Sequence, residues 1–176
     1  MSRRRVTVEE NALAFVIAND GDKSDLFQEI GRFIFEYSQL EFDLRQHFRR
    51  KIGFGRQFGD VMSTGFDFTR LCNALMAISA IEEGGQSDPV LVKHLKSSKK
   101  INDIRVAVVH GRWISSLGGG SVTKVSNHNM KRQRLLEKEG ELDHWSDAVV
   151  KLRTDIADAI DAANERRKAA NGGEPQ

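Results

Sequence analysis

Cysteine is almost absent from this chain: Cys72 is the single cysteine in 176 residues. One thiol excludes an internal disulfide and a zinc site built from cysteines. Because Cys72 falls on an apolar helix face, we interpret it as a buried structural thiol. The histidines also lack metal-ligand spacing, since His47 and His94 lie on different predicted helices without paired acids. The sequence therefore indicates no metal site, and we expect no cofactor.

Long apolar runs are missing as well. No stretch approaches the roughly 18 apolar residues that cross a bilayer, and the basic start at residues 1–5 is not followed by the apolar core of a signal peptide. With 39% hydrophobic and 30% charged residues, the composition is typical of one folded domain. We therefore expect a cytoplasmic protein that does not associate with membranes.

The formal net charge of +2 hides an uneven distribution along the chain. Residues 96–134 contain nine lysines or arginines and one acid, and residues 45–56 contain five basic residues and no acid. Residues 135–165 reverse the balance, with nine acids against three bases. The basic segments indicate either an ordinary solvated surface or a face for a polyanion.

Helical periodicity predicts four main helices and an all-α fold. The first begins at the N-cap Ser24, the second covers about residues 67–83, the third runs from Asp88-Pro89 to about residue 110, and the last covers about residues 142–167. Gly84 and Gly85 are expected to end the second helix. We predict a bundle of four to five helices, with a small β-hairpin of residues 112–117 and 121–126 between the third and last main helices. Residues 1–23 are interpreted as an N-terminal arm, 24–168 as the helical domain and 169–176 as a disordered tail.

Apolar stripes predict which helix faces turn inward. The stripe of the first helix includes Phe27 and Tyr37, and that of the second helix ends at Ile81. Glu41 falls on the first stripe, where its carboxylate either reaches water at an edge or pairs with an arginine of another helix. Phe35 and Phe42 make a second apolar face, which suits a bundle interior or a dimer contact.

An arginine and a histidine, Arg105 and His110, stand at the end of the third helix. Arginine binds phosphate with its planar fork, and histidine exchanges a proton near neutral pH. Asn102, one turn earlier, offers an amide that can orient a neighbour, and Gly111 frees the backbone after His110. The alternative is structural: His110 favours the helix dipole, and Arg105 pairs with Asp103, Glu41 or an acid of the last helix.

The segment Asn102-Asp-Ile-Arg105-x4-His110-Gly resembles the signature of the HEPN superfamily, which is an arginine, four to six residues and a histidine at a helix end in an all-α bundle. The order of helices over about residues 24–168 is also similar. Many members carry a polar residue after the arginine, where this chain has Val106. The resemblance implies a metal-independent RNA endonuclease, of the kind found among toxins and phage-defence effectors. It equally covers non-catalytic members that bind RNA or a partner protein.

The resemblance also implies roles for individual residues. The ribose 2′-OH would be the nucleophile, His110 the general acid or base, and Arg105 the phosphate ligand. Asn102 would orient one of these groups, with Glu41 holding Arg105 and Asp103 in a supporting position. A homodimer would bring two motifs to one cleft, and a cognate antitoxin or defence protein is a possible partner. Trp113 would either stack on a base or anchor the hairpin. The residues expected to attract phosphate are Lys99, Lys100, Arg112, Lys131, Arg132 and Arg134.

A third interpretation is a helical scaffold whose acidic last helix meets a basic partner. Charge reversal at Asp155, Asp158 and Asp161 would then matter more than the motif. The sequence is thus compatible with three functions: a nuclease, a binding module and a scaffold.

Overall fold

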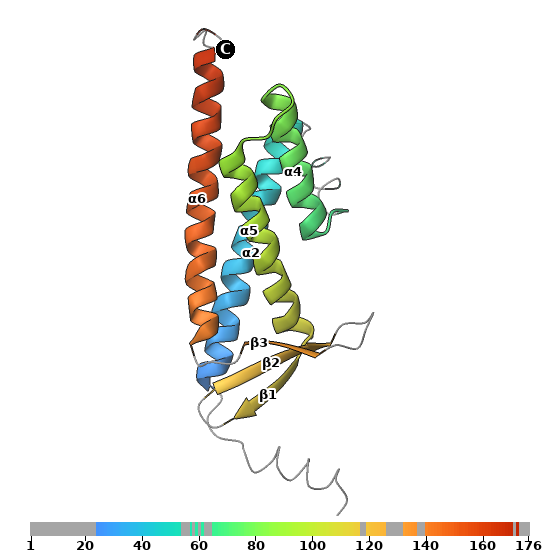
Figure 1. Ribbon diagram of the computed structural model, residues 1–176, viewed down its shortest axis with the longest axis vertical. Helices are drawn as coiled ribbons and strands as arrows, with labels where there is room; N and C mark the ends of the chain where they lie inside the picture. Colours follow the sequence, from blue (N-terminus) through green and yellow to red (C-terminus); the bar gives the residue numbers. More distant parts are fainter. Residues whose placement is uncertain are drawn as a thin grey trace, which may run out of the picture.

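Four long helices and a small sheet make up the described part of the molecule (Figure 1). The computed structural model describes residues 24–53, 57, 59, 61, 65–116, 119–125, 132–136, 140–170 and 172. The expected arm of residues 1–23 lies outside them. The helices are α2 (Ser24–Ile52), α4 (Phe68–Glu82), α5 (Pro89–His110) and α6 (Glu141–Ala170), which confirms the predicted helical bundle.

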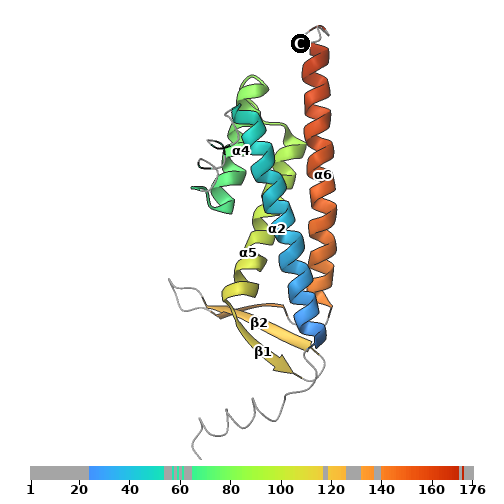
Figure 2. The same cartoon turned by 180° about the vertical axis from the view of Figure 1, so that it is seen from behind.

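The helices pack as a square in which α2 and α5 face each other across the diagonal. Helix α2 contacts α6 and α4, and α5 contacts the same two helices (Figures 1 and 2). Phe33 and Leu44 of α2, Leu95 of α5 and Val149 of α6 are almost completely buried between them. Burial of each such side chain contributes about 1.5–3 kcal/mol. The buried face of each helix therefore supplies most of the driving force for the bundle.

Capping residues fix two helix starts as the sequence predicts. The Asp67 carboxylate accepts a hydrogen bond from the Arg70 amide at 2.8 Å. The Asp88 carboxylate accepts from the amides of Val90 and Leu91 at 2.7 and 3.1 Å, and Pro89 occupies the first position of α5. Gly84, in the left-handed region at φ +74°, ends α4.

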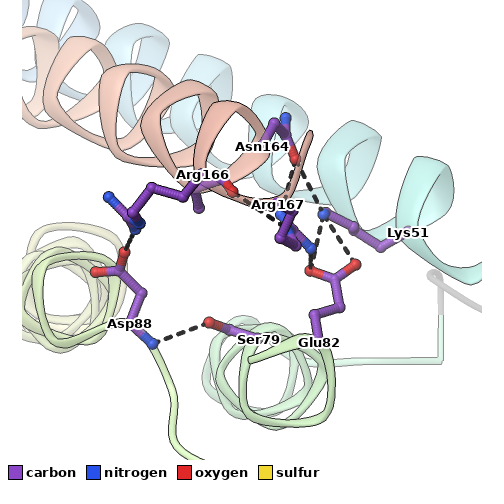
Figure 3. Close-up of polar contacts among 8 residues, drawn as sticks. Lys51, Ser79, Glu82, Asp88, Asn164, Arg166 and Arg167 are labelled. Atoms are coloured by element: carbon purple, nitrogen blue, oxygen red, sulfur yellow. Dashed lines mark hydrogen bonds and ion pairs between the residues drawn. The ribbon is translucent and has the colours of Figure 1, made fainter. Parts of the chain in front are cut away.

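Polar side chains tie the helices together at the end away from the sheet (Figure 3). The Glu82 carboxylate of α4 accepts from Lys51 of α2 at 2.8 Å and pairs with Arg167 of α6. Partial burial disfavours ionisation of Glu82, but the hydrogen bonds from Lys51 and Arg167 outweigh it and lower its pKa. Arg166 pairs with Asp88, so α6 is tied to the start of α5 as well.

A three-stranded antiparallel sheet connects α5 to α6, in the order β1-β2-β3. The strands are β1 (Arg112–Ser116), β2 (Gly119–Val125) and β3 (Arg132–Leu136). The two-stranded hairpin expected from the sequence is therefore not seen as such, because a third strand extends it. The residues of β3 are mainly polar and carry no strand pattern in the sequence, so this strand was not predicted. Leu136 at its end is 1% exposed and joins the bundle core.

Three other expectations need correction. Phe27 is 64% exposed and Ile81 is 79% exposed, although both belong to predicted inner stripes. They lie in the first turn of α2 and the last turn of α4, and periodicity does not say how far neighbouring helices extend. Residues 169 and 170, assigned to the tail, continue α6 to Ala170. Among the described residues, no helix combines the length and apolar character needed to cross a membrane.

His47 is buried in α2 beside the polar network and is held neutral. Burial, together with the positive charges of Lys51 and Arg50, lowers its pKa to about 4. An unfolded histidine titrates near pH 6.5. The unfolded state therefore binds more protons than the folded state as the pH falls from about 6.5 to about 4, and stability declines across that window.

We predict that the free energy of unfolding falls by about 2 kcal/mol between pH 7 and pH 5 because of His47. His47→Gln should remove this part of the pH dependence, since glutamine does not titrate. Urea unfolding at pH 7, 6 and 5 measures it, and His144→Gln, at an exposed position of α6, is the control. An unchanged pH dependence in His47→Gln would assign the effect to another group.

Candidate functional site

Tyr37 joins two of the predicted site residues on α5. Its hydroxyl donates a hydrogen bond to the Asn102 side-chain oxygen at 2.6 Å. The guanidinium carbon of Arg105 lies 5.7 Å from the centroid of the Tyr37 ring, which is a cation–π contact. Tyr37, Asn102 and Arg105 therefore form one group across the diagonal of the bundle, which we call the Tyr37 cluster.

The surroundings of Tyr37 make it a rigid support. The side chain is 3% exposed, and its ring centroid lies 5.1 Å from that of Phe68 in α4. Burial raises the pKa of the Tyr37 hydroxyl, and the nearby charge of Glu41 raises it further. The hydroxyl therefore remains a proton donor to Asn102. The sequence analysis treated Tyr37 only as an apolar stripe residue, although a phenol on such a stripe signals a buried hydrogen-bond partner.

Arg105 has no carboxylate partner among the described residues. The expectation that Glu41 holds Arg105 is wrong: Glu41 pairs with Arg45 one turn later on its own helix, at 2.5 Å. Asp103 is exposed and forms no ion pair with Arg105, and neither does any described acid of α6. No described carboxylate therefore compensates the positive charge of this half-buried guanidinium, which suits it to bind an anion.

His110 is the last residue of α5 and is exposed. On a helix with 3.6 residues per turn, residues five apart are separated by about 140° around the axis and about 7.5 Å along it. Arg105 and His110 thus project from different faces of α5. Gly111 follows with extended backbone, at φ −76° and ψ 162°, which any residue adopts. The backbone conformation at this position therefore does not require a glycine, contrary to the expectation that Gly111 frees the backbone after His110.

Trp113 anchors the sheet to the bundle. Its indole N–H donates to the Val108 carbonyl at 2.9 Å, and the ring packs against the core. Of the two interpretations of Trp113, the structure supports the anchor. The start of β1 is thereby fixed directly below the last turn of α5.

The predicted phosphate-binding residues divide between α5 and the sheet. Lys100 is exposed, whereas Lys99 is half-buried and donates to the Asn73 side chain of α4 at 3.2 Å. In the sheet, Arg112 pairs with Thr123, and Thr123 pairs with Arg134, so these positions form one row across the three strands. Arg132 pairs with Val125 further along β3, and Lys131 lies outside the described residues. The row of basic positions therefore begins at Arg112, two residues after His110 in the chain.

No group of three or more histidine, cysteine, aspartate or glutamate side chains is arranged to hold a metal ion within the described residues. Cys72 is buried, as predicted, and burial raises its pKa to about 12. Several acids of α6 already have partners in the same chain: Asp143 and Asp147 bind Arg32, and Asp155 binds Lys151. These pairs leave less acidic charge for a basic partner than the scaffold interpretation assumes.

We predict that the bond between Tyr37 and Asn102 stabilises the fold by about 1 kcal/mol. Tyr37→Phe keeps the ring under Arg105 but leaves the Asn102 oxygen without its donor, so the free energy of unfolding should fall by about that amount. A double-mutant cycle with Asn102→Ala, measured by urea unfolding, should give a coupling energy of similar size. Additive effects of the two substitutions would contradict a direct interaction.

No protein-family model matches this chain, and neither a curated protein nor a solved structure matches it. The resemblance to the HEPN superfamily is therefore carried by the motif of Arg105 and His110 and by the order of the helices. Function has to be argued from the chemistry of these residues.

Proposed function

We propose that this chain is a HEPN-like endoribonuclease that cleaves RNA without a metal ion. The observation that carries the proposal is the state of Arg105. Its guanidinium is positioned by the Tyr37 ring, and no described carboxylate neutralises it. An ordered arginine that no described carboxylate neutralises is suited to a phosphodiester, and the histidine of the same motif is exposed at the end of the same helix.

In the proposed reaction, the ribose 2′-oxygen attacks the adjacent phosphorus while the bond from phosphorus to the 5′-oxygen breaks. The products are a 2′,3′-cyclic phosphate and a 5′-hydroxyl. His110 exchanges a proton with the attacking or the leaving oxygen, for which an imidazole is suited near neutral pH. Arg105 stabilises the negative charge that develops on the phosphoryl oxygens. Asn102, bonded to Tyr37, orients the neighbouring Arg105.

The angle between the two motif residues favours a site built by two chains. One α5 helix projects Arg105 and His110 about 140° apart, so both reach one phosphate more readily where two helices meet. The resemblance implies such a homodimer. Val109, adjacent to His110, is 46% exposed and offers apolar surface at this end of α5. Phe35 and Phe42 are also exposed, so they do not belong to the interior of this bundle.

Cleavage is tested with purified protein and mixed cellular RNA in excess EDTA. The wild type should yield fragments that end in 2′,3′-cyclic phosphate, and Arg105→Ala and His110→Ala should each lower the rate by at least about a hundredfold. Arg70→Ala and His144→Ala replace an exposed arginine and an exposed histidine elsewhere, and they should cleave as the wild type does.

One observation favours a second function, that of a non-catalytic module which binds RNA or a partner protein. The family position after the arginine, which is usually polar, is Val106 in this chain. Salt-sensitive RNA binding without fragments, by folded wild-type protein, would support this function and contradict the nuclease. Loss of that binding in Arg105→Ala would still place RNA at the Tyr37 cluster.

We predict that the protein is a dimer in sedimentation experiments and that Val109→Asp shifts it toward the monomer, because a buried charge without a partner opposes association. The same substitution should lower RNA cleavage. Val150→Asp makes the same change at an exposed valine of α6, is the matched control and should leave the dimer intact. A dimer broken by Val150→Asp alone would place the contact away from the motif and contradict the two-chain site.

A further inference from the structure

A second concave site lies between α2 and α6, on the other side of α2 from the Tyr37 cluster. Figure 2 shows these two helices side by side, whereas Tyr37 packs toward α4 and α5. The cavity has a volume of about 480 Å³. Sites for small molecules usually have volumes of about 300–1,000 Å³. The cavity is therefore large enough for a ligand, and no motif residue lines it.

The floor of the cavity is apolar and its mouth carries an aromatic ring. Leu44, Ile156 and Ile160 form the floor. Phe42 lies at the edge with 55% of its surface exposed, which is high for a residue of this size. Apolar surface below and a phenyl ring beside the opening suit a flat molecule, because ring faces gain from burial and from contact with an aromatic side chain.

The charges around the cavity cancel. Two acids, Asp43 and Asp161, and two bases, Arg50 and Arg153, line it, so their formal charges sum to zero. Arg153 is already held by Asp43 at 2.8 Å and by Glu36 at 3.3 Å. Such a lining does not select a ligand with net charge. Arg50 and Asp161 form no ion pair with any described residue, so the rim offers both donors and an acceptor.

His47 provides a polar group deeper in the wall. Its side chain is about nine-tenths buried and lines the cavity, yet it forms no hydrogen bond with any described residue. A neutral imidazole has one N–H donor and one nitrogen acceptor. Among the described residues, Trp145 Nε1 is the fully buried side-chain polar atom without a partner, so the imidazole nitrogens of His47 remain accessible. A ligand with a donor and an acceptor along one edge can form hydrogen bonds with both of them.

We propose that this cavity binds an uncharged, planar heteroaromatic molecule of nucleoside size. The ring faces lie on the apolar floor beside Phe42, and the hydrogen-bonding edge meets His47. An aliphatic anion fits worse, because a carboxylate only accepts hydrogen bonds and so leaves the acceptor nitrogen of the imidazole without a partner, and because it meets the carboxylate of Asp161. This site is independent of the proposed nuclease and uses none of its residues.

The test uses adenosine and uridine as probes for the full-length protein in isothermal titration calorimetry. Saturable binding with one site per chain is expected for at least one of them. Ala157→Trp places a large side chain at the exposed edge of the cavity and should weaken binding at least tenfold. Ala162→Trp makes the same change at an exposed position of α6 that does not line the cavity, and it should bind as the wild type does. The ring resonances of His47 should shift on binding in NMR spectra.

Three results would overturn the proposal: no saturable binding of either nucleoside, binding that Ala157→Trp leaves unchanged, or binding of octanoate but of neither nucleoside. Arg105→Ala separates this site from the nuclease, because it should abolish cleavage while nucleoside affinity stays at the wild-type value. Loss of nucleoside binding in Arg105→Ala would place the probe at the Tyr37 cluster and also contradict the proposal.

Discussion

The hydrogen bond between Tyr37 and Asn102 joins the two diagonal helices of this bundle and constrains how they lie relative to each other. Helices α2 and α5 contact each other far less than either contacts α4 or α6. A buried polar bond at this position permits few relative placements of the helices, because both partners lose free energy when the geometry fails. Arg105 lies against the same tyrosine ring, so the contact that fixes the helices also fixes the arginine.

The two ends of the bundle are held together by different forces. At one end, Glu82, Lys51 and Arg167 connect three helices through ion pairs and hydrogen bonds. At the other end, apolar side chains from the sheet close the core, with Leu136 and Trp113 packed against it. The end closed by apolar contacts is also the one at which α5 finishes at His110 and at which Arg32 of α2 pairs with Asp143 and Asp147 of α6.

The sequence predicted the helices better than it predicted their side-chain partners. Helix starts are encoded locally, by an aspartate cap and by Pro89, and the structure places α4 and α5 as expected. The partner of Glu41 was predicted wrongly because an acid on an apolar stripe pairs equally well with a residue on its own helix or on another. In the structure the partner is Arg45, one turn away on the same helix. The sequence alone does not distinguish a partner on the same helix from one on another helix, because that depends on how the helices pack.

Other parts of the site could have been read from the sequence. Once a helix is expected to continue through His110, its spacing from Arg105 already places the two side chains on different faces. The third strand was harder, because its mainly polar residues lack a periodic pattern; Leu136 at its end reaches the core. The role of Tyr37 needed the fold, since Asn102 lies 65 residues away in the chain.

The connection between α5 and β1 consists of Gly111 alone. A connection of one residue has little conformational freedom. In addition, the Gly111 amide donates a hydrogen bond to the Ala107 carbonyl at 2.7 Å. On the other side of Gly111, the indole N–H of Trp113 donates a hydrogen bond to the Val108 carbonyl. The sheet and the last turn of α5 are therefore one continuous unit, so a change in the tilt of the sheet would also change the direction in which His110 points.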